Sequence, residues 1–286
     1  MKKQNIASTI GVIILFLLGL GILLYPSFSD WWNTRRANSL ITEYESVIEE
    51  KSQDEIENIF KLAVAYNATL LGNKLPDAFA ELQLPPDATY DHVLDPIGTG
   101  YMGTCEIPKI KQKISIFHYT TKEVLEKAIG HLAGSSLPVG GESTHCVVSA
   151  HRGLPSAKLF TDLDRMEEGD VFYIHVLNRT LAYEVDQIKI VEPTETSDLS
   201  IIEGEDYCTL VTCTPYAVNS HRILVRGHRI PYTEEKYQED LLITSVPSTN
   251  SVLIRIACVI VGLLLAGIVI LILGRFNRKK EAKEIE

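Results

Sequence analysis

Hydrophobic residues along this chain follow three different patterns, and these divide it into segments. Residues 6–25 and 256–273 are two uninterrupted apolar runs, each long enough to cross a bilayer as a helix. In 36–71, apolar residues recur every three or four positions among Glu and Lys, which predicts one or two amphipathic helices covering a larger body. In 102–232 the apolar runs are short and several alternate with polar residues, which predicts strands.

The strand-like region contains six clear segments separated by turn residues such as Gly169 and Asp170. These segments are 113–118, 144–150, 171–177, 180–191, 207–212 and 222–229. One helical insertion is expected at 156–166. We therefore predict a mainly β fold, a barrel with helical additions.

The pattern of two further segments allows more than one structural interpretation. The helical stretch at 36–71 also suits a coiled-coil dimer, but its heptad pattern breaks near 52–55. Proline and glycine interrupt 72–103, which predicts a long irregular loop of the kind that is commonly functional or disordered.

The first apolar run is either a cleaved signal peptide or an uncleaved anchor. Lys2 and Lys3 precede it, and basic residues are expected there both for a signal peptide and for an anchor. Its apolar core is longer than a signal peptide needs, and no small-x-small cleavage signal precedes the aromatic residues that follow it. Those aromatics, Tyr25, Phe28, Trp31 and Trp32, suit a membrane interface. We predict a signal anchor.

The second apolar run determines the expected orientation. It is followed by Arg275, Arg278, Lys279, Lys280 and Lys283, whereas Arg255 is the one basic residue just before it. Positive charges favour the cytoplasmic side, so the C-terminus is expected there. Two spans then predict a cell-membrane protein with both termini cytoplasmic and the middle segment extracellular.

Charge and cysteine content narrow the function classes. The formal charge is -10, and because each cytoplasmic end contributes +2, the remainder carries -14. An acidic domain is a poor binder of nucleic acid, because phosphate contacts need clustered Lys and Arg. Without a CxxC pair or a clustered acidic loop, we expect no metal and no cofactor. Cys105, Cys146 and Cys208 are expected as buried thiols, with a Cys105–Cys146 disulfide as the alternative.

Three residues far apart in the sequence suggest a reaction. Cys213 ends the β-branched run TLVTC, and Arg222 follows nine residues later in the next strand-like run. His151 lies in SAHRGLP, 62 residues before the cysteine. A thiol nucleophile needs a rigid strand end, a nearby fixed positive charge and a group that transfers protons near neutral pH. These are the candidate catalytic residues.

The segments TLVTC, TPY, NSHRILVRG and SAHRG together resemble the sortases, and most closely the class C, pilin-polymerising sortases of Gram-positive bacteria. The resemblance covers roughly the whole chain. It implies a closed β-barrel of about eight strands, N-terminal helices and one transmembrane helix at each end. It also implies a nucleophile at Cys213, a general acid and base at His151, oxyanion or substrate stabilisation by Arg222, and a substrate-proximal Thr212.

The activity implied by this resemblance is transpeptidation. A class C enzyme cleaves an LPxTG-like sorting signal between Thr and Gly through a thioester, and joins the acyl group to a lysine amine of another pilin. The alternatives are a cell-wall-anchoring sortase that uses a peptidoglycan cross-bridge amine and a membrane-anchored cysteine protease. In papain-like proteases the cysteine precedes the histidine and begins a helix, whereas here the order is reversed. A pilus subunit would carry its own LPxTG-like signal, and none precedes 252–273.

Class C sortases also carry a lid anchored by an Asp-Pro-aromatic motif. Asp77 and Phe79 keep the acid and the aromatic but have Ala78 between them, whereas Asp95 and Pro96 lack the aromatic. Position after the helices favours Asp77 and Phe79. The expected organisation is cytoplasmic 1–5, anchor 6–25, helices and lid-like loop 30–101, barrel 102–235, linker 236–251, second span 252–274 and basic tail 275–286.

Overall fold

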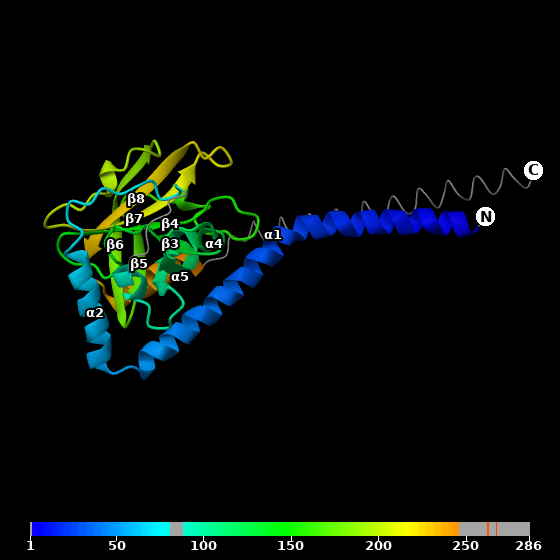
Figure 1. The fold of residues 1–286 in the computed structure, drawn as a ribbon. Helices are drawn as coiled ribbons and strands as arrows, with labels where there is room; N and C mark the ends of the chain where they lie inside the picture. Colours follow the sequence, from blue (N-terminus) through cyan, green and yellow to red (C-terminus); the bar gives the residue numbers. More distant parts are fainter. Residues whose placement is uncertain (1, 81–87, 246–261, 263–266, 268–286) are drawn as a thin grey trace, which may run out of the picture. The chain divides into compact units, whose positions relative to one another are not determined.

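Eight strands close into one barrel among residues 2–80 and 88–245, which together with Gly262 and Gly267 are the residues that the computed structural model describes (Figure 1). The strands are β1 (Tyr101–Ile107), β2 (Gln112–His118), β3 (Ile129–His131), β4 (Thr144–Ser149), β5 (Val171–Val176), β6 (Arg179–Val191), β7 (Asp206–Thr214) and β8 (His221–Ile230). Their order around the barrel is β1-β2-β3-β4-β7-β8-β6-β5. The six expected strands are confirmed to within two residues at each end.

Two of the strand pairs are parallel, β2 with β3 and β4 with β7, and the others are antiparallel. The β4–β7 pair joins segments far apart in the sequence, with Ser149 opposite Val211. Parallel neighbours end at the same edge of a sheet. The chain segments that follow β4 and β7 therefore start at one end of the barrel.

Alternation along the strands fills the barrel with apolar side chains, among them Phe172, Leu210 and Val225. Cys105, Cys146, Cys208 and Cys213 are free thiols, so the alternative Cys105–Cys146 disulfide is not formed. Instead Cys146 lies opposite Cys208 across the parallel β4–β7 pair.

The described residues fall into two units, one of which includes the residues up to Ser27 and the other Phe28–Ser245. Helix α1 (Lys2–Glu50) begins in the first unit and continues into the second. Among the described residues it is the helix long and apolar enough to cross a membrane, with a window of mean hydropathy 1.8. The expected second span, 252–274, lies outside the described residues apart from Gly262 and Gly267.

Within the second unit, α1 and α2 (Gln53–Asn67) pack apolar residues against the barrel, among them Ile41 and Ile48 of α1 and Ile56 and Ala63 of α2. The helices separate at Ser52, whose hydroxyl and backbone form a capping box with Glu55. Tyr44 of α1 is buried, and its hydroxyl donates to the carbonyl of Met102 and accepts from the N–H of Leu177. These contacts fasten α1 to the start of β1 and the end of β5.

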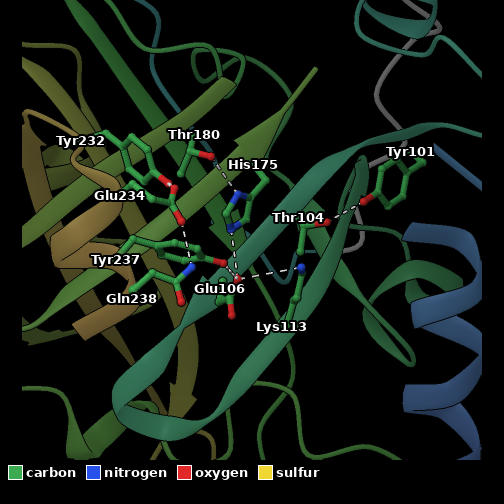
Figure 2. Close-up of polar contacts among 10 residues, drawn as sticks. All are labelled: Tyr101, Thr104, Glu106, Lys113, His175, Thr180, Tyr232, Glu234, Tyr237 and Gln238. Carbon is green, nitrogen blue, oxygen red and sulfur yellow. Dashed lines mark hydrogen bonds and ion pairs between the residues drawn. The ribbon is translucent and has the colours of Figure 1, made fainter. Parts of the chain in front are cut away.

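The stretch expected as a linker from residue 236 begins as helix α5 (Glu234–Ser245). It is held on the barrel because the Tyr173 hydroxyl donates to Asp240, 2.6 Å away, and the Tyr237 hydroxyl donates to Glu106, 2.9 Å away. Figure 2 shows that Glu106 also meets Lys113 and His175. Helix α5 is therefore part of the folded unit.

The expected helix at 156–166 is wrong. The structure has turns there, followed by a single 3₁₀ turn, η2 (Leu163–Arg165). Phe160 and Leu163 of this segment are nevertheless buried in the core. The other short elements are α3 (Ala88–His92), α4 (Lys122–Leu125), η1 (Pro108–Ile110) and η3 (Ser197–Leu199).

Candidate active site

Strands β7 and β8 bring the predicted nucleophile and the predicted cation together. Cys213, the second-last residue of β7, lies directly opposite Arg222, the second residue of β8. Opposed residues of an antiparallel pair share one face, with Cβ atoms about 4.5–5.5 Å apart. Cys213 is 8% exposed, so its sulfur lies in a mostly desolvated position beside the arginine.

Strand β4 carries His151 to the same end of the barrel. The N–H of Ala150 donates to the carbonyl of Val211, and the buried hydroxyl of Thr212 donates to the carbonyl of Ala150, at 3.2 and 2.7 Å. Thr212 therefore ties the residue before the histidine to the residue before the cysteine. Because its side chain is fully buried, this contact stabilises the site from within the barrel wall.

The segment after His151 folds back on itself. The Phe160 N–H donates to the carbonyl of His151 at 3.2 Å, and the Gly153 N–H donates to the Thr161 hydroxyl at 3.1 Å. Arg152 forms an ion pair with Asp164 across the same loop. The histidine is thus followed by a turn closed by main-chain hydrogen bonds.

Glycine at 153 is required by the β7–β8 hairpin. Its φ is +76°, and a Cβ at this position would lie 2.7 Å from the ring of Tyr216. The Arg152 guanidinium lies 5.9 Å from the centre of that ring. These contacts pack the hairpin against the histidine loop, and the glycine of SAHRG together with the tyrosine of TPY is their sequence signal.

Asp77 and Phe79 both contact the site. Asp77 accepts two hydrogen bonds from Arg222, from Nε at 2.8 Å and from Nη2 at 2.7 Å. The Phe79 ring centre lies 5.0 Å from the Arg222 guanidinium and 5.6 Å from the His151 ring. One aromatic side chain therefore touches both the predicted cation and the predicted acid and base.

Ala78 takes the position of the proline expected in a lid motif. It is 1% exposed and packs in an apolar cluster with Val147, Val211 and Leu224. The cluster lies against β4, β7 and β8, the strands that carry the site. The Asp-Ala-Phe segment is therefore held by an ion pair, a buried methyl group and a ring contact in succession.

Asp95 and Pro96 lie at a turn before β1. The Asp95 carboxylate accepts a hydrogen bond from the N–H of Thr99 at 2.9 Å, which closes that turn. Of the two lid candidates, Asp77 with Phe79 is the one whose contacts reach Arg222 and His151.

Burial and charge set the protonation of the two reactive groups. Burial raises the pKa of the Cys213 thiol, the charge of Arg222 partly offsets the rise, and the charge of Asp77 adds to it. Burial lowers the pKa of His151, with a small opposing effect from Glu126. Both shifts favour a neutral thiol at Cys213 and a neutral imidazole at His151 near pH 7.

Other parts of the described chain offer no metal site, because no group of three His, Cys, Asp or Glu side chains lies close enough together there. A groove of about 1170 Å³ lies at the other end of β7 and β8, where Asp206 and Arg229 line it together with Phe60 of α2. It shares no residue with the site around Cys213.

Comparison with known proteins defines the class. The family model described as "Sortase domain" matches residues 105–230. Sortase C of Streptococcus pneumoniae, a structure that addresses pilin substrate specificity, is 47% identical, with 68% of this chain and 98% of that chain covered and a TM-score of 0.63. Sortase C1 of Streptococcus agalactiae is 46% identical, with 70% and 99% covered and a TM-score of 0.65.

The curated relatives are more distant. Sortase D of Bacillus subtilis (strain 168) is 29% identical over 131 residues, which is 45% of this chain and 63% of that protein. Sortase A of Bacillus anthracis is 22% identical over 229 residues, 79% and 96% of the two chains. The chain therefore belongs to the sortase family, and its similarity to solved structures is to sortase C enzymes.

Proposed function

We propose that this chain is a pilin-polymerising cysteine transpeptidase with Cys213 as its nucleophile. The observation that supports this most directly is the register that makes Cys213 the neighbour of Arg222, at the barrel end where β4 leads into His151. The similarity to sortase C enzymes, one of them described with pilin substrates, supports the substrate class.

In the first half-reaction, the Cys213 sulfur attacks the carbonyl carbon of the threonine in an LPxTG-like signal. Since the thiol is neutral, it must lose its proton, and the neutral imidazole of His151 accepts it. The threonine–glycine C–N bond then breaks, the departing glycine amine takes that proton, and the acyl group remains on sulfur as a thioester.

In the second half-reaction, a lysine amine of another pilin attacks the thioester carbon. His151 accepts a proton from the amine and returns it to the departing sulfur of Cys213. The products are an isopeptide bond and the free thiol, so the enzyme is regenerated. Repetition of the two steps lengthens a covalent pilus.

Arg222 would stabilise the oxyanion that forms in both steps, because a guanidinium stays charged and offers several donors. Two of its donors are held by Asp77. We therefore propose that the substrate replaces Asp77 at Arg222 and Phe79 at His151, which makes this segment a lid. The segment 30–101 then combines the covering helices with the lid, and 102–235 is the catalytic barrel.

The proposed location is the cell membrane. The apolar part of α1 supports an N-terminal anchor, with the barrel outside the cell. Two spans, at 6–25 and 252–274, would leave both termini cytoplasmic, with basic residues at 275–286 on that side.

The test uses the full chain in detergent with pilins encoded by the same genome. We expect a ladder of covalent products on a denaturing gel, a threonine–lysine isopeptide bond in the mapped cross-link, and neither product with Cys213→Ala. Transfer to a peptidoglycan cross-bridge amine alone would instead assign the cell-wall-anchoring role. Transfer to water alone would assign a protease.

A further inference from the structure

Helix α1 contacts the loop that follows His151. The Asn33 side chain donates from Nδ2 to the carbonyl of Ser156 at 2.7 Å, and the Ser29 hydroxyl donates to the same oxygen at 3.2 Å. The Asp30 carboxylate accepts from the N–H of Lys158 at 2.9 Å. Three side chains within about one turn of α1 thus hold two adjacent peptide groups of the loop.

The same loop continues directly to the histidine. The Thr161 hydroxyl bonds to the carbonyl of Lys158 and accepts from the N–H of Gly153. The Phe160 N–H donates to the carbonyl of His151 itself. A displacement at Lys158 therefore reaches the main chain of residues 151 and 153 through one or two hydrogen bonds.

The loop has little regular structure of its own to resist such a displacement. From residue 151 to residue 162 it consists of bends and turns, and Gly153 and Leu159 both have positive φ. Local hydrogen bonds alone define a turn loosely, because each ordered residue loses conformational entropy. The buried side chains of Ala157, Leu159 and Phe160 hold the loop to the core on one side, and the peptide groups at Ser156 and Lys158 are held from the other side by α1.

Helix α1 is a rigid element outside this loop. Its Tyr44 is buried against β1 and β5, and the turn Ser29–Asn33 lies 11 to 15 residues earlier on the same continuous helix. At 1.5 Å per residue this is about 16–22 Å of helix. The helix is thus fixed to the barrel at Tyr44 and reaches the histidine loop with Asp30 and Asn33.

We propose that Asp30 and Asn33 are positioning residues for His151, which align its imidazole for proton transfer by fixing the loop through Ser156 and Lys158. This inference rests on the proposed function, in which His151 transfers protons between sulfur and amine. A proton-transferring group must lie within hydrogen-bond reach of both partners, and a misplacement of about 1 Å costs about a hundredfold in rate. Neither residue is expected to contact the substrate.

The test compares four variants of the full chain in detergent. Asn33→Asp keeps the side-chain volume but removes the two donors, and Asp30→Ala removes the acceptor. Asp30→Asn keeps an acceptor oxygen and serves as the conservative rescue. Asn38→Asp is the matched control, an exposed asparagine five residues further along the same helix.

The readouts are kcat and KM for cleavage of an LPxTG-type peptide, the rate at which iodoacetamide alkylates Cys213, and the melting temperature. For Asn33→Asp and Asp30→Ala we expect kcat to fall at least about tenfold, with KM within about twofold. Alkylation should stay within about twofold of the parent, because the burial of Cys213 and the charges of Arg222 and Asp77, which set the thiol pKa, are not contacts of Asp30 or Asn33. Asp30→Asn and Asn38→Asp should retain the parent kcat.

If the parent enzyme is active and kcat is unchanged in Asn33→Asp and Asp30→Ala, the positioning role is overturned. A rise in KM at constant kcat overturns it too. So does a loss of kcat that comes with an equal loss of alkylation rate and of melting temperature. A parent enzyme that forms no thioester with the peptide rejects the proposed function instead, together with the inference built on it.

Discussion

Asp77 and Arg222 form a two-hydrogen-bond ion pair that controls the charge around Cys213. The arginine charge lowers the pKa of the thiol and the aspartate charge raises it, on top of the larger rise caused by burial. In the closed arrangement the aspartate therefore opposes formation of the thiolate. When the aspartate leaves, the arginine charge acts on the sulfur unopposed.

Replacing the aspartate tests this arrangement. In Asp77→Asn we expect the pKa of Cys213 to fall, so the pH profile of alkylation shifts to lower pH. Since alkylation follows the thiolate, the rate with iodoacetamide at pH 7.5 should rise by about three- to tenfold. Asp54→Asn, an exposed acid at the start of α2, is the control.

An unchanged or slower alkylation rate in Asp77→Asn would show that the aspartate neither shields the thiol nor raises its pKa.

Phe79→Ala tests the aromatic contact with the same alkylation assay. Equal labelling rates in the parent and in Phe79→Ala would reject a closing role for that ring.

At this scale the sequence predicted which residues to examine, but not how they meet. Cys213, His151 and Arg222 were identified from motifs that lie within a few residues of each of them. From the sequence, Ala78 is known only as the residue that stands where a lid motif has proline. Its burial against Val147, Val211 and Leu224 depends on where a distant loop packs, and no local pattern contains that information.

Among the elements, α2 adds a buried polar contact to its apolar packing on the barrel. Asn67, 4% exposed at the last position of α2, accepts from the N–H of Leu137 at 2.7 Å and donates to its carbonyl at 3.2 Å. The side-chain amide of Asn67 thus binds both the N–H and the C=O of Leu137.

We expect Asn67→Ala to lower the free energy of unfolding by about 1–3 kcal/mol, because it leaves the N–H of Leu137 without its partner, whereas the carbonyl of Leu137 still accepts from the N–H of Val139. Chemical denaturation of the full chain in detergent measures this. Asn73→Ala, at an exposed position shortly after the helix, should change it by less than about 0.5 kcal/mol. Equal effects of the two substitutions would contradict the docking role of Asn67.

Helix α5 is attached through the ionised carboxylate of Glu106. Burial opposes its ionisation, yet hydrogen bonds from His175 and Tyr237 and the charge of Lys113 lower its pKa overall (Figure 2). A lowered carboxylate pKa stabilises the fold above the ordinary pKa of about 4.3, and this contribution is lost as pH falls through the lowered value.

Glu106→Gln should therefore reduce the free energy of unfolding at pH 7 by about 1–3 kcal/mol, since the hydrogen bonds lose their charged acceptor. The difference from the parent should shrink as the pH falls below about 4.3. Unfolding measured across pH 3 to 7 tests both statements. A difference that stays constant over this range would mean that ionisation of Glu106 does not hold α5.

Sequence pattern predicts some of these elements and not others. Alternation located six strands, because the barrel interior accepts apolar side chains at every second position. The expected helix at 156–166 is not formed, because Phe160 enters the core from a turn and Leu163 from the short 3₁₀ helix η2. Helix α5 was missed, since it is held by Tyr173 and Glu106, which are distant in sequence.

At the scale of the whole molecule, function depends on one long-range pairing. The parallel contact of β4 with β7 places Ser149 opposite Val211, so the chain continues to His151 and to Cys213 at the same end of the barrel, although 62 positions separate these two residues. Register across parallel strands cannot be read from hydrophobic pattern, and here the resemblance to the sortases supplied it. The helix α1 then adds a support for the histidine loop that no motif indicates.

The most direct test of the account is the mass of the enzyme after it is mixed with an LPxTG-type peptide in the absence of any acceptor amine. We predict an adduct equal to the peptide acyl fragment that ends at threonine, mapped to Cys213, released by hydroxylamine, and absent from Cys213→Ala. An adduct on another residue, or cleavage by the Cys213→Ala variant, would contradict the proposed thioester mechanism.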